Sequence, residues 1–431
     1  MENFFKDTVM KLWPSFFIFL SFSVLASSDL DQKLLGYVKT FQLKPVSSPG
    51  EMNKNLFYLG RDLFFEKKLS GNKNISCADC HHPRTMTTDL IPLSLGEGAE
   101  GLEVTSGGRV QKKGKILLRN SPALFNLHNV NVFFWDGRVQ WNPKTSEFIT
   151  PEKLPSEFIP VLKNALAAQA LFPMLSHEEM RGEKGTNEIA DAPTAQRAWE
   201  LLFKRIMNVP RYKTLLLELF PGENLSIAHV ARAISHFEEQ AFYSGDSNFD
   251  RYLKGDLLAM SETQKKGMDV FFEKGKCGSC HRGEHLSGFG FHNIGVPQIG
   301  PEDNFKEDLG KFALDPRPET MYAFRIPPLR NVALTPPYMH DGAFKTLSEV
   351  IEHYDDIESS LKNYVLIDDH KNYNVKLIGP ESQMNEKILS TLSRKLERNL
   401  FFTEEEEKAL EEFLVGALTG RRFLPLVRKS E

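Results

Sequence analysis

Two short segments decide the fold of this 431-residue chain: Cys77-Ala-Asp-Cys80-His81 and Cys277-Gly-Ser-Cys280-His281. Together they contain all four cysteines of the sequence. In a C-x-x-C-H motif, two thiols can bond to the two vinyl groups of one porphyrin, and the histidine can ligate its iron. A zinc site would not need a histidine at the same offset twice, and a thioredoxin-like pair would not recur in this form. The sequence therefore predicts two covalently bound haem c groups, with His81 and His281 as proximal ligands.

Both motifs belong to a longer internal repeat. The segment 60–67 (GRDLFFEK) precedes the first motif, and the segment 267–274 (GMDVFFEK) precedes the second. Apolar residues at helical spacing predict a helix packed against each haem, and Ser261 with Gln264 predicts a capping box at the start of the second helix. Each motif is followed by an LRN triplet and then by an aromatic residue with a D-G pair, at 118–120 with 135–137 (WDG) and at 329–331 with 340–342 (HDG).

The repeat predicts a mainly α-helical protein with long loops, built from two cytochrome-c-like haem domains related by internal duplication. Strand signals are sparse. A helix expected over 227–242 leads to the junction, so we expect an N-terminal haem domain over residues 50–243 and a C-terminal one over 244–431. Thr403 as N-cap and Glu406 predict a last helix ending near Leu418. The polar segment 359–399 suggests no function.

The start of the chain has the pattern of a secretory signal peptide. Lys6 and Lys11 precede an apolar stretch over 12–25, and small residues follow, so we expect cleavage near Ala26 or Ser28. The stretch is shorter than the roughly 20 residues of a membrane-spanning helix, and no later segment is long and apolar enough to span a membrane. Removal of residues 1–26 would leave an exported protein in the periplasm. This agrees with the haem motifs, because haem c is attached outside the cytoplasm.

Composition narrows the class of protein. Apolar residues make up 41% and charged residues 26% of the chain, which excludes wholesale disorder. The balance of 53 basic and 57 acidic residues gives a net charge of −4. This mild acidity argues against nucleic acid or an anionic membrane as the main partner.

Two C-x-x-C-H domains with these accessory motifs resemble the bacterial dihaem cytochrome c peroxidase family, which includes MauG-like enzymes that oxidise a protein substrate. The resemblance implies an oxidoreductase that reduces hydrogen peroxide at the N-terminal haem while the C-terminal haem handles electrons. The electrons would come from a small cytochrome, a copper protein or a side chain of a partner protein. A dihaem electron carrier without catalysis, and a redox sensor, are the alternatives from other classes.

The resemblance also implies which residues face the peroxide. The family has a glutamine and a glutamate ten residues apart, with a proline four residues after the glutamine, and Gln169, Pro173 and Glu179 match this pattern. Peroxide cleavage needs a base that moves a proton from the inner to the outer oxygen, which a carboxylate can do. Glu179 is the candidate for this base, and Gln169 would orient the peroxide or a water. On the residues alone, Glu179 and His177 would belong to a solvated helix face.

A tryptophan between the two haems completes the site that the resemblance implies. In the family it stands ten residues before the glutamine, and Trp135 of the sequence FWDGR is assigned to it. From the residues alone, Trp135 could equally be a buried core aromatic. Trp141 is the weaker choice because it lacks the FWDGR context.

The first haem departs from many relatives in its resting state. Those relatives carry a histidine in a Gly-His-Gly loop that caps the resting iron, whereas Glu97 occupies that position here. A carboxylate is a poor match for a low-spin cap, so we expect an open, high-spin iron. His82 cannot easily reach the other face of the ring, and His128 is a remote substitute.

The second haem is expected to differ from that of the family's peroxidases in the sixth ligand of its iron. That ligand lies fourteen residues after the histidine of a PY-x-H motif, and it is methionine in peroxidases and tyrosine in MauG-like proteins. Counting from His340 gives Tyr354, with Met339 as the rival and His353 as a further alternative. A thioether raises the iron's reduction potential, and an anionic phenolate lowers it. Tyr354 therefore favours the MauG-like branch without establishing a MauG-like substrate.

The resemblance further implies one calcium ion between the domains. The side-chain oxygen of Asn120 and the backbone carbonyls of Thr335 and Pro337 would bind it, with waters completing the shell. Hard oxygen donors of this kind suit calcium. Asn120 could instead cap a turn, and the sequence does not separate these two roles.

Overall fold

The computed structural model describes residues 28–99, 104–105, 108–109, 114–302, 306–367, 375–379 and 381–427. The predicted signal segment, residues 1–26, lies outside these ranges. Helices dominate the described chain and its strands are only two to four residues long, which confirms the expected mainly α-helical class with long loops. Within the described ranges, no helix combines the length and apolarity needed to cross a bilayer.

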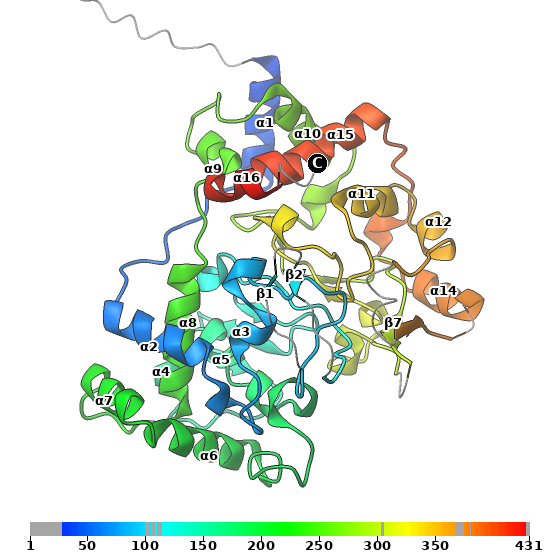
Figure 1. Ribbon diagram of the computed structural model, residues 1–431. Helices are drawn as coiled ribbons and strands as arrows, with labels where there is room; N and C mark the ends of the chain where they lie inside the picture. The colour runs from blue at the N-terminus through cyan, green and yellow to red at the C-terminus, as the bar shows by residue number, and fades with distance from the viewer. Residues whose placement is uncertain are drawn as a thin grey trace, which may run out of the picture.

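The helices fall into two groups along the chain (Figure 1). The first group is α2 (Lys54–Phe64), α3 (Cys77–Cys80), α4 (Ile159–Leu162), α5 (Ala165–Gln169), α6 (Ala195–Met207), α7 (Pro210–Leu219) and α8 (Ile227–Ala241). The second group is α9 (Asn248–Leu253), α10 (Glu262–Phe272), α11 (Leu347–Asp355), α12 (Ile357–Lys362), α14 (Glu381–Ser390), α15 (Glu404–Glu412) and α16 (Leu424–Val427), joined by α1 (Asp29–Thr40) from the start of the chain.

The strands form small antiparallel sheets that connect loops rather than a central layer. β3 pairs with β4 and β4 with β5, while β1 pairs with β2, β6 with β8 and β7 with β9. Their bounds are β1 (Val104–Thr105), β2 (Gly108–Arg109), β3 (Val132–Phe133), β4 (Val139–Asn142), β5 (Glu147–Ile149), β6 (Phe291–His292), β7 (Ile299–Pro301), β8 (Phe324–Arg325) and β9 (Val375–Leu377).

The N-terminal group packs around the long helix α8, which lies beside α2 (Figure 1). Asn53 caps α2 by accepting a hydrogen bond from the backbone N–H of Leu56. The buried residues of α2 recur at helical spacing and face α8, where Ala233 and Phe237 are buried in the same core. Ala78 of the first C-x-x-C-H motif is buried in this same core.

The C-terminal group repeats this arrangement with α10 and α15. Ser261 and Gln264 form the predicted capping box at the start of α10, and Thr403 and Glu406 form the predicted one at the start of α15. After Glu412, α15 continues as a turn of π-helix, Phe413–Ala417, whose residues close the core over α10.

One glycine in each helix pair shows how closely the two arrangements correspond. A Cβ on Gly60 of α2 would overlap with the carbonyl oxygen of Ala233, and a Cβ on Gly267 of α10 would overlap with that of Ala409. In both pairs the nearest atom beyond that carbonyl group is the Cβ of a phenylalanine, at 2.9 Å in the first and 2.8 Å in the second. Only glycine permits these helix backbones to approach so closely.

The first helix of the described chain belongs with the C-terminal group. α1 packs on α10, and Leu34 is fully buried there (Figure 1). Its Asp31 forms a buried ion pair with Lys265, at 3.0 Å between Oδ1 and Nζ, and accepts a hydrogen bond from the Tyr252 hydroxyl at 3.0 Å. The expected domain boundaries left this segment unassigned, because its partners lie more than two hundred residues away in sequence.

The described parts of the polar segment 359–399 form a packed layer on the C-terminal half. Its β9 pairs with β7, and α12 and α14 enclose a small apolar cluster that includes Leu361 and Ile388. Asn293 donates hydrogen bonds to the Ile388 carbonyl and to Thr391, which joins this layer to the loop after β6. The segment therefore has a structural role that its composition did not indicate.

Candidate active site

A cavity of about 1900 Å³ lies beside the first C-x-x-C-H motif. Cys77, Cys80 and His81 line it, as the attachment of a haem requires. Gln169 and Glu179, the two residues assigned to peroxide, also line it. The structure therefore brings together residues that are more than a hundred positions apart in sequence, Cys77 and Glu179, and the cavity is large enough for a porphyrin.

A second cavity lies beside the second motif, and its lining includes Cys277, Cys280, His281, Met339 and Tyr354. Trp135 lines both cavities, so it lies at the boundary between the spaces expected for the two haems. Its Nε1 donates a hydrogen bond to the carbonyl oxygen of Asn120 at 2.9 Å, which fixes the orientation of the ring. The ring centroid of Trp135 lies 6.5 Å from that of His340.

Trp135 and Gln169 do not have the sequence spacing that the resemblance implies. The expected separation of ten residues is wrong for this chain, because β4, β5 and α4 lie between the two residues. Both side chains nevertheless line the first cavity. Trp141, the alternative relay, lies on β4 and packs against Phe148 with ring centroids 4.3 Å apart. It lines neither cavity.

The two proximal histidines are held in the same way. His81 Nδ1 lies 3.0 Å from the Thr87 carbonyl oxygen, and His281 Nδ1 lies 2.8 Å from the Leu286 carbonyl oxygen. An Nδ1–H donated to a carbonyl fixes the ring and leaves Nε2 for a metal. Burial lowers the pKa of His281 to about 4, so its imidazole is neutral, as ligation requires. The four cysteines are free thiols rather than disulfides, which also fits covalent haem attachment.

Glu179 lies in a single turn of π-helix, His177–Arg181, on the wall of the first cavity. Ser176 caps this turn, because its Oγ accepts from the Glu179 backbone N–H at 3.2 Å. Such turns are common at functional sites. A Cβ on Gly96 would overlap with the Glu178 carbonyl oxygen, and the Glu97 N–H donates to that same oxygen at 2.8 Å. The loop after the first haem motif therefore braces the turn that carries Glu179.

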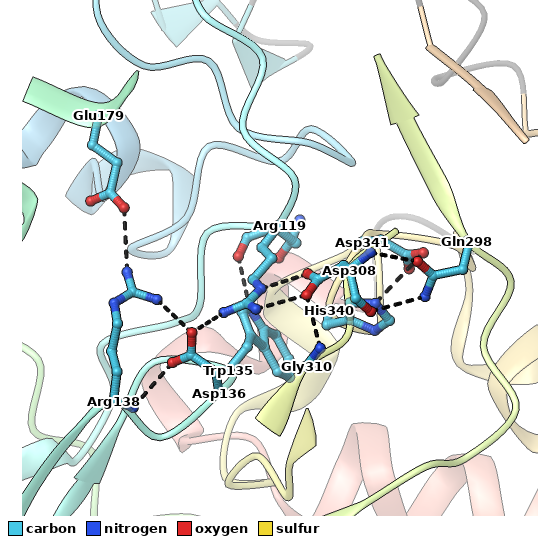
Figure 2. A network of polar contacts seen from close by, with 11 residues as sticks. Arg119, Trp135, Asp136, Arg138, Glu179, Gln298, Asp308, Gly310, His340 and Asp341 are labelled. Atoms are coloured by element: carbon cyan, nitrogen blue, oxygen red, sulfur yellow. Dashed lines mark hydrogen bonds and ion pairs between the residues drawn. The ribbon is translucent and has the colours of Figure 1, made fainter. Parts of the chain in front are cut away.

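Burial raises the pKa of Glu179 above its usual range, and the guanidinium of Arg138 opposes this shift. Arg138 Nη2 lies 3.4 Å from Glu179 Oε1 (Figure 2). A carboxyl group of raised pKa can take up and return a proton near neutral pH. Arg138 belongs to the FWDGR segment, but the sequence alone assigns it no role. Its position three residues after Trp135 was the available signal.

Arg138 is the first member of a chain of ion pairs that extends towards the second cavity (Figure 2). Its Nη1 lies 3.0 Å from Asp136 Oδ2, and Arg119 Nη1 lies 2.6 Å from that oxygen. Arg119 also forms a two-pronged pair with Asp308, at 2.6 and 2.8 Å. Burial alone would raise the pKa of Asp136, but the two arginines lower it overall. This series of ion pairs joins Glu179 and the segment around Trp135 in one network.

The three residues considered as caps of the first iron line neither cavity: Glu97, His82 and His128. The Glu97 carboxylate accepts hydrogen bonds from Asn72 Nδ2 at 2.7 Å and Asn74 Nδ2 at 2.9 Å. His177, assigned from sequence to the surface, does line the first cavity. Its Nδ1 lies 2.6 Å from the Gly182 carbonyl oxygen, so the neighbouring loop holds its ring.

The three candidates for the sixth ligand of the second iron differ in their surroundings. Tyr354 on α11 and Met339 both line the second cavity. His353 does not, and both of its ring nitrogens have other partners, Ser360 Oγ at 2.9 Å and the Ile294 carbonyl oxygen at 2.8 Å. Burial raises the pKa of Tyr354. Of the three, His353 is therefore the least available to a metal.

The residues expected to bind calcium lie on segments that meet at the junction of the two halves. Asn120 is buried, and its backbone N–H donates to the His340 carbonyl oxygen at 2.6 Å. Its Nδ2 donates to the carbonyl oxygens of Ile91 and Pro92, at 2.8 and 3.2 Å. Thr335 and Pro337 flank Pro336 in the loop before His340. The described residues contain no cluster of three or more His, Cys, Asp or Glu side chains arranged for a metal ion.

Comparison with known proteins agrees with this site. A sequence model of the di-haem cytochrome c peroxidase family matches residues 54–257. The cytochrome c551 peroxidase of Pseudomonas aeruginosa is 31% identical over 296 residues, which cover 68% of this chain and 69% of that protein. The methylamine utilization protein MauG of Methylorubrum extorquens is 28% identical over 336 residues, covering 76% and 78%.

A solved structure shows the same overall arrangement. The crystal structure of a MauG-like protein associated with microbial copper homeostasis aligns with a TM-score of 0.59 and 26% identity. The alignment covers 89% of this chain and 95% of that protein. The chain belongs to the di-haem cytochrome c peroxidase family.

Proposed function

We propose that this protein is an exported peroxidase that reduces hydrogen peroxide in the first cavity, with electrons passing by Trp135 from the second. The observation that carries this proposal is the distribution of residues between the two cavities. Glu179 and Gln169 line the first but not the second, whereas Trp135 lines both. Family membership supports two haem c groups, one bound by Cys77, Cys80 and His81 and the other by Cys277, Cys280 and His281.

The haem iron, when bound, supplies the coordination site for peroxide and the electrons for its reduction. Glu179 would move a proton from the inner to the outer oxygen of the peroxide, so that water can leave. Its raised pKa suits this exchange, and Arg138 holds the carboxylate in place. Gln169 would hold the peroxide or a water through its amide, which can both donate and accept a hydrogen bond.

A second candidate function is the MauG-like oxidation of side chains on a partner protein. Tyr354 in the lining of the second cavity supports it, because a phenolate ligand lowers the potential of the iron and stabilises its oxidised forms. The relatives include proteins named MauG as well as proteins named cytochrome c peroxidase. Under the first function the electron donor is a small cytochrome c or copper protein, and under the second it is the partner's side chain.

Two accompanying features are part of the proposal. Residues 1–26 would direct export to the periplasm and be removed there. A calcium ion at the junction of the halves would be bound by the Asn120 side chain and the carbonyls of Thr335 and Pro337. The contact between Asn120 and His340 supports a role at this junction. Calcium removal should then weaken the coupling between the two haems.

The decisive experiment uses the mature holoprotein with two haems attached. Optical and electron paramagnetic resonance spectra are recorded at rest and after addition of hydrogen peroxide. We expect a high-spin signal from the first haem and rapid spectral change without prior reduction. Two low-spin haems that do not respond to peroxide would reject catalysis and leave an electron carrier. Oxidation of a reduced small cytochrome, compared with oxidation of a partner protein, distinguishes the two catalytic functions.

A further inference from the structure

A buried arginine at the boundary of the two cavities has no anionic partner among the residues that the structure describes. Arg325 ends β8 and is 6% exposed, and its side chain lines both the first and the second cavity. Its Nε donates to the Phe134 carbonyl oxygen at 3.1 Å, and its backbone N–H donates to the Trp135 carbonyl oxygen at 2.7 Å. Its Nη1 is buried and has no hydrogen-bond partner among the described residues.

Two other buried arginines near the junction each have a carboxylate partner. Arg119 pairs with the carboxylates of Asp136 and Asp308. Arg330, which is 4% exposed, lies 3.2 Å from the carboxylate of Asp250. Burial lowers the pKa of Arg325 to about 10, and no carboxylate of the described chain offsets this effect. An unpaired buried charge is costly, so Arg325 calls for a partner beyond the described residues.

The cofactors can provide that partner. Each haem carries two propionate carboxylates, which are its only anionic side groups, and Arg325 lines both of the cavities expected to hold the haems. A guanidinium binds a carboxylate through parallel N–H donors, with Nη1 available here. This inference rests on the proposed function only in requiring that both haems are bound.

We propose that Arg325 is a haem-propionate binding residue at the boundary of the two cavities. Because its backbone also holds the carbonyl of Trp135, the bound carboxylate would be fixed next to the indole at that boundary. Arg325 would thus keep the propionate ionised and hold the edge of the ring against the relay residue. It is a binding and positioning residue, and peroxide itself need not contact it.

The test measures potentials rather than turnover. The midpoint potentials of both haems are determined by spectroelectrochemistry between pH 5.5 and 8.5 in the wild type and in Arg325→Gln. In the wild type the propionate stays ionised, so no dependence on pH arises from it. In the variant the propionate loses its counter-charge and titrates within this range, so we expect the potential of at least one haem to become pH-dependent. The propionate bending band in the resonance Raman spectrum should shift as well.

Two further variants make the result unambiguous. Lys306→Gln removes an exposed cation from the wall of the first cavity and should leave the pH dependence of both potentials unchanged. Arg325→Lys keeps the charge but loses the planar fork, so it should assemble even if Arg325→Gln does not bind two haems, and its propionate band should still shift.

The result that overturns the inference is equally specific. If the haem-loaded Arg325 variants keep the wild-type propionate band, and Arg325→Gln also keeps the wild-type pH dependence of both potentials, Arg325 does not bind a propionate. This outcome is distinguishable from failure of the proposed function, because the wild-type protein would still bind two haems and react with peroxide. A wild type without haem, or one that does not respond to peroxide, would contradict the proposed function instead.

Discussion

Arg138 Nη2 lies 3.4 Å from Glu179 Oε1, although the two residues come from different segments and 41 positions separate them. This pair joins the FWDGR segment to the π-helical turn on the wall of the first cavity. It therefore connects the residue assigned to electron relay with the residue assigned to proton transfer, within one network of ion pairs.

Replacing Glu179 tests the proton transfer directly. Glu179→Gln keeps the shape of the side chain but removes the base, so the rate of peroxide cleavage should fall by about 10²–10⁴-fold. Stopped-flow spectroscopy of the holoprotein after mixing with peroxide measures this rate. Glu178→Gln is the neighbouring control, since Glu178 is exposed and only its charge acts on the pKa of Glu179, so this variant should change the rate far less. An unchanged rate in Glu179→Gln would remove Glu179 from the mechanism.

Replacing Arg138 should move the pH profile. The Arg138 guanidinium lowers the pKa of Glu179 against the larger effect of burial. Arg138→Gln therefore raises that pKa further, and because the ionised carboxylate is the active base, the acidic limb of the rate profile should move to higher pH. Arg138→Lys keeps the charge and should move it less. The two profiles are compared by stopped-flow spectroscopy, and identical acidic limbs in all three proteins would contradict this role.

Trp135→Phe tests whether the indole transfers electrons between the two haems. The first haem should still react with peroxide, because Glu179 and Gln169 are untouched, but the spectral change at the second haem should be delayed. Rapid-mixing spectroscopy that follows both haems measures the delay. Trp141→Phe is the control, since Trp141 lines neither cavity. Wild-type timing in the Trp135 variant would exclude the indole as a relay.

Tyr354→Phe identifies the sixth ligand of the second iron. Loss of a phenolate ligand should change the spectrum of that haem and raise its midpoint potential, because an anionic oxygen stabilises oxidised iron. Spectroelectrochemistry measures the shift. Met339→Leu is the counterpart and should leave the potential unchanged. The reverse pattern would assign Met339 as the ligand.

The two close-approach glycines should matter equally for stability. Gly60→Ala and Gly267→Ala force a methyl group into a backbone carbonyl, so each should lower the free energy of unfolding by about 1–3 kcal/mol. Gly36→Ala, in an open position on α1, should be neutral or raise it by up to about 1 kcal/mol. Thermal unfolding of the holoproteins checks all three. Wild-type stability in the first two would show that the helices can move apart freely.

The sequence predicted the fold class because its signals were local. The haem motifs, the capping boxes at Ser261 and Thr403, and the apolar spacing of the flanking helices each lie within a few residues, and the structure contains the predicted capping boxes. The attachment of α1 to α10 was not predictable in this way. It depends on Asp31 meeting Lys265, and no local pattern connects two residues so far apart.

Residues of the candidate site could be predicted where they belong to a sequence motif. They could not be predicted where only tertiary contacts bring them to the site. Glu179 and Gln169 line the first cavity together, as the resemblance implied. Asp308, by contrast, lies in a loop without any motif, and only the fold brings it to Arg119. Arg325 also carries no sequence signature, since its importance comes from the absence of a carboxylate beside its Nη1 in the described structure.

The seating of α1 has a consequence for how this chain can be divided. A fragment that begins at residue 244 would contain α10 but not α1, which packs on it. Lys265 would lose its ion pair with Asp31, and the apolar residues that contact Leu34 would be exposed. A ribosome completes α1 first, yet its docking surface emerges some 234 residues later. The C-terminal half is thus a discontinuous folding unit, because its first segment, α1, is synthesised before the N-terminal half. We therefore do not expect the two halves to fold one after the other as separate units.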